Sequence, residues 1–233
     1  MITISFVILL LISSLFVDPR REYPDNNRYY RWLLHTASSA VIRLLNIQVK
    51  VSGMEKVPQG TRFLLVSNHL SNFDPIITWQ VFRKYDLAFV SKPENFKIPM
   101  FGRIIRRCCF LPIDRENPRN AIRTVNEAAK RIKDDTVSYG IYPEGTRNKG
   151  DAMLLPFHNG VFKIAQKADV PIVVISVSGT QNIHKQLFRG CEVELRVLDV
   201  IPKEKVKVMQ TARIGSLTEL ILRHDLGRIT NVT

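Results

Sequence analysis

The stretch SNHLSNFDP, residues 67–75, sets polar side chains between apolar runs and could carry acid–base chemistry. It contains Asn68 and His69, and Asp74 follows in the spacing His-x4-Asp. A carboxylate that accepts the imidazole N–H fixes the tautomer and leaves the other ring nitrogen as a base. Asp74 also precedes Pro75, and proline is favoured where a helix begins, so helix capping is an alternative role. By itself, the spacing leaves both interpretations open.

A second polar stretch, YPEGTRN at residues 142–148, also follows an apolar run. Gly145 permits close approach of the backbone to a ligand, and Glu144 and Thr146 offer hydrogen-bonding groups. Arg147 can hold a phosphate through two parallel N–H groups. As a bare turn, the stretch would need no function, so it becomes informative only together with the first one.

Two further cations stand just after apolar runs. Lys92 lies in VSKPEN, and Arg115 ends LPIDR. An isolated cation in such a place is ordinarily a surface residue.

The elements that must position these residues alternate between strands and helices. Helical spacing of apolar residues is found in 75–83, 120–133, 159–167 and 206–223. This alternation predicts an α/β fold in which a mixed, mostly parallel sheet is flanked by helices. Both polar stretches then follow the ends of strands, where ligands commonly bind in such sheets. The expected strands are 47–53, 62–67, 87–91, 108–113, 137–143, 171–179 and 192–201.

The chain begins with an uninterrupted apolar segment. Residues 1–17 contain no charged side chain, and as a helix they would extend about 25 Å, slightly less than a bilayer core of about 30 Å. A loop and an amphipathic helix follow, so we expect residues 1–46 to form a membrane-associated helical hairpin and residues 47–233 to form the catalytic domain. Arg20 and Arg21 favour a cytoplasmic location for that domain. A buried core helix is the alternative for the first segment.

The composition points to an anionic partner. The formal net charge is +13 over 233 residues, which suits an anionic membrane surface, whereas no basic–aromatic interleaving favours nucleic acid. We expect the basic stretch 101–123 to turn exposed arginines, Arg106 and Arg107 among them, toward headgroups or phosphates. The three cysteines and the scattered histidines predict reduced core thiols rather than disulfides or a metal site.

Taken in order, four stretches resemble the motifs of the glycerolipid acyltransferase family. Its Asn-His-x4-Asp motif matches residues 68–74, and its arginine after an apolar run matches Arg115. Its Pro-Glu-Gly-Thr-Arg motif matches residues 143–147, with a tyrosine in the preceding aromatic place. Its Val-Pro-Ile-x-Pro strand matches residues 170–172, although Val174 stands where a second proline is common. The resemblance extends over roughly half of the chain.

This resemblance implies transfer of a fatty acyl group from a thioester, either acyl-CoA or acyl carrier protein, to the free hydroxyl of 1-acylglycerol-3-phosphate (lysophosphatidic acid), giving phosphatidic acid. It implies that His69 is the general base, that Asp74 orients it, and that no cofactor is needed beyond the acyl donor. Another lysophospholipid acceptor, hydrolysis of the thioester and a non-catalytic binding role are the alternatives. The implied substrate-binding residues are Asn68, Lys92, Arg115, Glu144, Gly145, Thr146 and Arg147.

Overall fold

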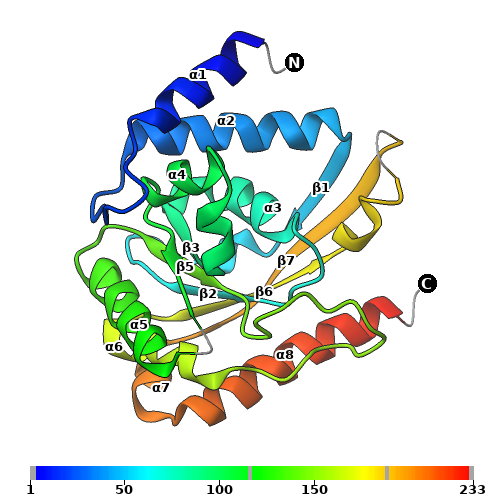
Figure 1. Ribbon diagram of the computed structural model, residues 1–233. Helices are drawn as coiled ribbons and strands as arrows, with labels where there is room; N and C mark the ends of the chain where they lie inside the picture. Colours follow the sequence, from blue (N-terminus) through cyan, green and yellow to red (C-terminus); the bar gives the residue numbers. More distant parts are fainter. Residues whose placement is uncertain (1–3, 115–116, 187–188, 231–233) are drawn as a thin grey trace.

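The computed structural model describes residues 4–114, 117–186 and 189–230, which form three layers around one central sheet (Figure 1). Its strands are β1 (Ile47–Ser52), β2 (Leu64–Ser67), β3 (Leu87–Ser91), β4 (Leu111–Pro112), β5 (Ser138–Ile141), β6 (Ile172–Ser178) and β7 (Cys191–Ile201). Their order in the sheet is β1-β7-β6-β2-β5-β3-β4. Every strand pair of the described residues is parallel except β6 with β7. The predicted mixed, mostly parallel sheet is therefore confirmed.

Helices cover both faces of this sheet (Figure 1). One face carries α2 (Arg28–Leu44), α3 (Asp74–Val81) and α4 (Phe101–Arg106), and α1 (Ile4–Leu15) lies outside α2. The other face carries α5 (Pro118–Lys133), α6 (Lys163–Ala168), α7 (Lys203–Val208) and α8 (Thr211–Thr230).

The central strands supply the core on both faces, because successive side chains of a strand point to opposite sides. In β2, Leu64 and Val66 join the buried cluster under α5–α8, whereas Leu65 joins the cluster under α2–α4. Neighbouring β6 repeats this alternation, with Val174 on the first side and Val173 on the second. A parallel sheet covered on both faces therefore requires continuous apolar runs, which is the pattern these strands have.

The strand predicted at residues 108–113 is reduced to the two residues of β4. Cys109 has a left-handed backbone with φ of 64°, which interrupts an extended conformation. Pro112 also lacks the N–H that would continue a ladder. The three cysteines are free thiols, and all of them are buried. Helix α4 is an element that the periodicity did not predict.

The single closing helix predicted at residues 206–223 is instead two helices, α7 and α8. Met209 lies between them in an extended conformation, with φ of −82° and ψ of 146°. The side-chain amide of Gln166 donates hydrogen bonds to the carbonyl oxygens of Val206 and Met209. These bonds satisfy carbonyl groups that a continuous helix would have paired internally.

The two N-terminal helices, α1 and α2, lie side by side (Figure 1). Tyr30 of α2 donates a hydrogen bond to the carbonyl oxygen of Ser13, and the Asn27 side chain caps α2. Among the described residues, no helix combines the length and the hydropathy that crossing a membrane requires. The division of the chain into residues 1–46 and 47–233 stays a prediction.

Arg107, which directly follows α4, holds the linker between α1 and α2. Arg107 donates to both carboxylate oxygens of Asp25, at 3.0 and 3.1 Å, and its guanidinium lies 4.3 Å from the centre of the Tyr23 ring. Arg106 packs over Phe96, and burial lowers its pKa. Because the Arg107 side chain is only 16% exposed and pairs with Asp25, it is not one of the exposed arginines expected in the stretch 101–123. Where the exposed members of that stretch face stays a prediction.

Candidate active site

The carboxyl ends of four neighbouring strands meet at one edge of the sheet. Strands β6, β2, β5 and β3 run parallel, so the segments that follow them all leave at this edge. The β2 segment carries His69, the β5 segment carries Tyr142 and Glu144, and the β3 segment carries Lys92. The two polar stretches of the sequence are thus brought together by the strand order.

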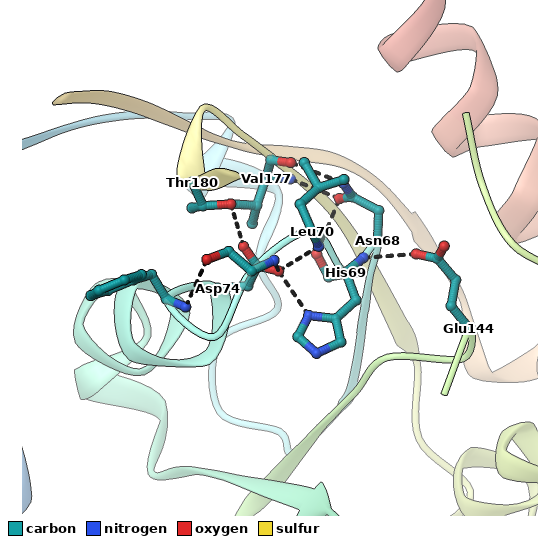
Figure 2. A network of polar contacts seen from close by, with 10 residues as sticks. Asn68, His69, Leu70, Asp74, Glu144, Val177 and Thr180 are labelled. Carbon is teal, nitrogen blue, oxygen red and sulfur yellow. Dashed lines mark hydrogen bonds and ion pairs between the residues drawn. The ribbon is translucent and has the colours of Figure 1, made fainter. Parts of the chain in front are cut away.

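His69 and Asp74 form the predicted pair (Figure 2). His69 Nδ1 lies 2.8 Å from Asp74 Oδ2, which also accepts the main-chain N–H groups of Leu70 and Ser71. Asp74 is fully buried, whereas the His69 side chain is 17% exposed. With Nδ1 donating to the carboxylate, Nε2 keeps a free lone pair and can act as a base.

Asp74 does not have the alternative role of helix N-cap in the structure. The N-cap residue of α3 is Phe73, and Asp74 is the first residue of the helix itself. Its carboxylate turns back to the loop that precedes the helix rather than to the N–H groups of α3. The short loop therefore folds around this carboxylate, which is the arrangement needed to place His69 beside it.

The main chain of His69 is held from both sides by the second polar stretch. Glu144 Oε1 accepts the His69 N–H at 2.7 Å, and the N–H of Asn148 donates to the His69 carbonyl oxygen at 2.7 Å. The other Glu144 oxygen accepts the N–H of Leu155 at 2.8 Å. Burial raises the pKa of Glu144, and these two N–H groups offset part of that effect. Glu144 therefore fixes the loop rather than facing open space.

Tyr142 supports the imidazole from its face. The His69 and Tyr142 rings stack with centroids 4.2 Å apart and planes inclined by 22°. Phe89 of β3 stacks on Tyr142 in turn, at 5.9 Å and 6°. The ring of His69 is therefore fixed by a carboxylate at its edge and an aromatic stack at its face.

Asn68 is buried and bonded to β6. Its Nδ2 donates to the carbonyl oxygen of Val177, and its Oδ1 accepts the N–H of Val177, both at 2.9 Å. Pairing of β2 with β6 ends at Ser67 and Ile175, so the Asn68 side chain continues that pairing beyond the strand. This geometry favours a positioning role for Asn68, which was predicted to bind substrate.

A cavity of about 500 Å³ opens beside His69. Its wall includes the predicted residues Lys92, Gly145, Thr146 and Arg147. Arg115 lies outside the described residues. Within those residues, no group of three potential metal ligands lies close together. The rest of the wall is largely apolar and comes from α2, α3, α4, β3 and the segments that flank α4 and follow β5: Leu34, Ile76, Trp79, Phe89, Ile98, Phe101, Ile105, Phe110 and Tyr142.

Two residues of this site were missed by the sequence reasoning. Asn148 ends the YPEGTRN stretch, but nothing in its type indicates that its main-chain N–H binds His69. Thr180 follows Gly179 after β6, and its hydroxyl donates to Asp74 Oδ1. Both contacts join segments distant in sequence, so residue spacing carries no signal for them.

Comparison with known proteins shows the family to which the chain belongs. The model of the acyltransferase family matches residues 48–178, which is more than half of the chain and includes both polar stretches. A 1-acyl-sn-glycerol-3-phosphate acyltransferase of Haemophilus influenzae is 29% identical over 203 residues, covering 86% of this chain and 82% of that protein. One from Limnanthes alba is 33% identical over 165 residues, covering 70% of this chain and 57% of that protein.

A solved structure has the same fold. The crystal structure of a 1-acyl-sn-glycerophosphate acyltransferase from Thermotoga maritima matches with a TM-score of 0.74 over 97% of this chain and 89% of that one. Its sequence identity is 22%, so the likeness concerns the fold. The family match over residues 48–178 carries the assignment: the chain belongs to the acyltransferase family.

Proposed function

We propose that this protein transfers a fatty acyl group from a thioester to the free hydroxyl of 1-acylglycerol-3-phosphate, giving phosphatidic acid. The names of its relatives support this acceptor. The observation that carries the proposal is the His69–Asp74 pair beside a cavity with both cationic and apolar walls. A base, a phosphate ligand and an acyl-binding surface are the three things this reaction requires.

His69 acts as the general base in this proposal. Nε2 takes the proton of the acceptor hydroxyl while its oxygen attacks the carbonyl carbon of the thioester. The C–O bond forms and the C–S bond breaks, and the imidazolium then gives its proton to the departing thiolate. A positioned base of this kind contributes about 10²- to 10⁴-fold to a rate. Asp74 orients the ring and stabilises the imidazolium.

Different parts of the cavity wall bind different parts of the substrate in this proposal. Lys92, Thr146 and Arg147 hold the phosphate, and Gly145 allows the backbone to approach it. The apolar part of the wall takes a fatty acyl chain. Arg115 remains a proposed phosphate ligand from the resemblance alone. Asn68 and Glu144 instead hold the loops that carry His69 and Arg147, because their side chains already bond to main-chain groups.

Product analysis tests the reaction and its alternatives. The purified protein is incubated with lysophosphatidic acid and either acyl-CoA or acyl carrier protein as the donor, and phosphatidic acid is measured by mass. We expect phosphatidic acid with the wild type and a loss of about 10²-fold or more with His69→Ala. Other lysophospholipids run in parallel identify a different acceptor. Fatty acid released at the same rate with and without lysolipid would show a hydrolase instead.

We also propose that α1 and α2 lie on an anionic membrane surface, with the catalytic domain on the cytoplasmic side. Several apolar side chains of α1 are exposed, including Ile12 at 49% and Leu15 at 72%. Burying such a side chain fully contributes about 1.5–3 kcal/mol, and one membrane-facing helix supplies several such side chains. Arg20 and Arg21, both exposed, follow this surface and can contact anionic lipid.

Flotation with liposomes in high salt tests the membrane contact. The double variant Ile12→Asp, Leu15→Asp should lower the bound fraction by at least about tenfold. Val208→Asp is the matched control, because Val208 is 81% exposed on α7, against the opposite face of the sheet. Equal binding of all three proteins would contradict the proposal. Protection of a C-terminal tag from protease added outside intact cells tests the cytoplasmic location.

A further inference from the structure

Thr180 is a buried residue outside both polar stretches that contacts the predicted base pair. It lies just beyond β6, and its side chain is fully buried. Its hydroxyl donates to Asp74 Oδ1 at 2.5 Å, whereas Oδ2 is the oxygen that meets His69 and two main-chain N–H groups (Figure 2). The two oxygens of Asp74 therefore have separate tasks: one holds the histidine, and the other is held by Thr180.

The backbone delivers Thr180 to this place through a turn that requires glycine. Gly179 has φ of 87°, and a Cβ there would lie 2.3 Å from the carbonyl oxygen of Glu192 in β7. The turn is thus packed tightly between β6 and β7. Asn68 is bonded to Val177 on the same strand, two residues before that turn. The end of β6 consequently holds the catalytic loop at two points, Asn68 and Asp74.

We propose that Thr180 is a positioning residue of this active site, whose hydroxyl keeps the Asp74 carboxylate in the rotamer that places Oδ2 on His69. The inference rests on the proposed acyl transfer. A hydrogen bond to an ionised acceptor is stronger than one between neutral groups, so its loss frees the carboxylate to turn. A base misplaced in this way slows the chemical step. Because Thr180 is not part of the cavity wall, substrate binding should change little.

Steady-state kinetics separate this role from a purely structural one. Thr180→Val keeps the shape but removes the hydroxyl, and should lower kcat by about tenfold to a hundredfold, the range for one hydrogen bond to a charged group. KM for both substrates should stay within about threefold, and Thr180→Ser should restore kcat to within about threefold of the wild type. Thr180→Ala replaces the valine variant if the latter does not fold, as judged by circular dichroism.

Thr218→Val is the matched control. Thr218 is also fully buried, and its hydroxyl donates to a main-chain carbonyl within α8. Its replacement should leave kcat and KM unchanged. A fall in kcat equal to that of Thr180→Val would show that losing any buried hydroxyl is enough, and would overturn the proposal.

A double-mutant cycle tests whether Thr180 acts through Asp74. In an Asp74→Ala background, adding Thr180→Val should cost less than about twofold in kcat, because the group it positions is gone. The same loss in both backgrounds would refute this path. If the wild type forms no phosphatidic acid but releases fatty acid, the proposed acyl transfer is wrong. The double-mutant cycle then uses the rate of fatty acid release in place of phosphatidic acid formation. If the wild type is active and folded Thr180→Val keeps its kcat, the Thr180 proposal alone fails.

Discussion

Acid should weaken the protein through a histidine buried between α2 and α3. His35 is 2% exposed, and its ring stacks on Trp79 with centroids 4.4 Å apart. The guanidinium of Arg31 lies on the same indole, 4.6 Å from its centre. Burial, and after it the positive charges of Arg31 and Arg83, lower the pKa of His35 from 6.5 to about 4. The folded state therefore resists protonation of this ring.

The sign and size of the effect follow from linkage. A histidine whose folded-state pKa is depressed adds stability above its unfolded-state value, and that stability is lost as pH falls. For His35 the window runs from 6.5 down to about 4. The difference between those two pKa values corresponds to about 3 kcal/mol. This is a large share of the roughly 5–15 kcal/mol by which a domain is stable.

Urea unfolding at several pH values between 7 and 4.5 measures this contribution. His35→Phe keeps a flat ring on Trp79 but cannot titrate, so the free energy of unfolding should fall less steeply with acid than in the wild type. The gap should approach about 3 kcal/mol near the lower end. His224→Phe, at an exposed position of α8, is the control and should keep the wild-type slope. Parallel slopes for His35→Phe and the wild type would refute the reasoning.

Substitutions at three further positions test the site and its frame. Arg31→Met removes the hydrogen bond to the Leu87 carbonyl oxygen (2.9 Å) and should lower the free energy of unfolding, measured by urea titration, by about 2–4 kcal/mol. A change below about 0.5 kcal/mol would contradict this expectation. Tyr142→Phe should keep kcat within about threefold, whereas Tyr142→Leu, which breaks the stack on His69, should lower it about tenfold. Arg147→Ala should raise KM for lysophosphatidic acid about tenfold or more and leave KM for the donor unchanged; equal changes in both would exclude a phosphate role.

Much of the frame was predictable because its signals are local. The apolar runs of β2 and β6 are buried on both faces of the sheet. Each run therefore predicts a central strand by itself, without knowledge of the neighbouring strands. The loop that joins His69 to Asp74 is equally local, and its carboxylate binds groups three to five residues away. Contacts between residues this close in sequence can be predicted from the order of residue types.

The features that escaped prediction depend on partners far along the chain. Thr180 meets Asp74 across 106 residues, and Arg107 meets Asp25 across 82. From the sequence, an arginine such as Arg107 is predicted to be exposed. The packing of the linker, which places Asp25 against it, can be known only from the structure. The left-handed Cys109 is similar, because cysteine carries no local preference for the conformation that shortens β4. Tertiary structure, not local propensity, decides these positions.

The residue types in the two polar stretches make sense once their partners are main-chain atoms. The Asn68 amide can both donate and accept, which matches the C=O and N–H of Val177, whereas the two oxygens of the Glu144 carboxylate accept from two N–H groups. Both side chains are buried and already bonded to main-chain groups, which favours a positioning role for each. In the proposed function, side chains of the cavity wall such as Arg147 contact the substrate. Substitutions at Asn68 or Glu144 should therefore lower kcat, whereas substitutions of the cationic wall residues Lys92 and Arg147 should raise KM.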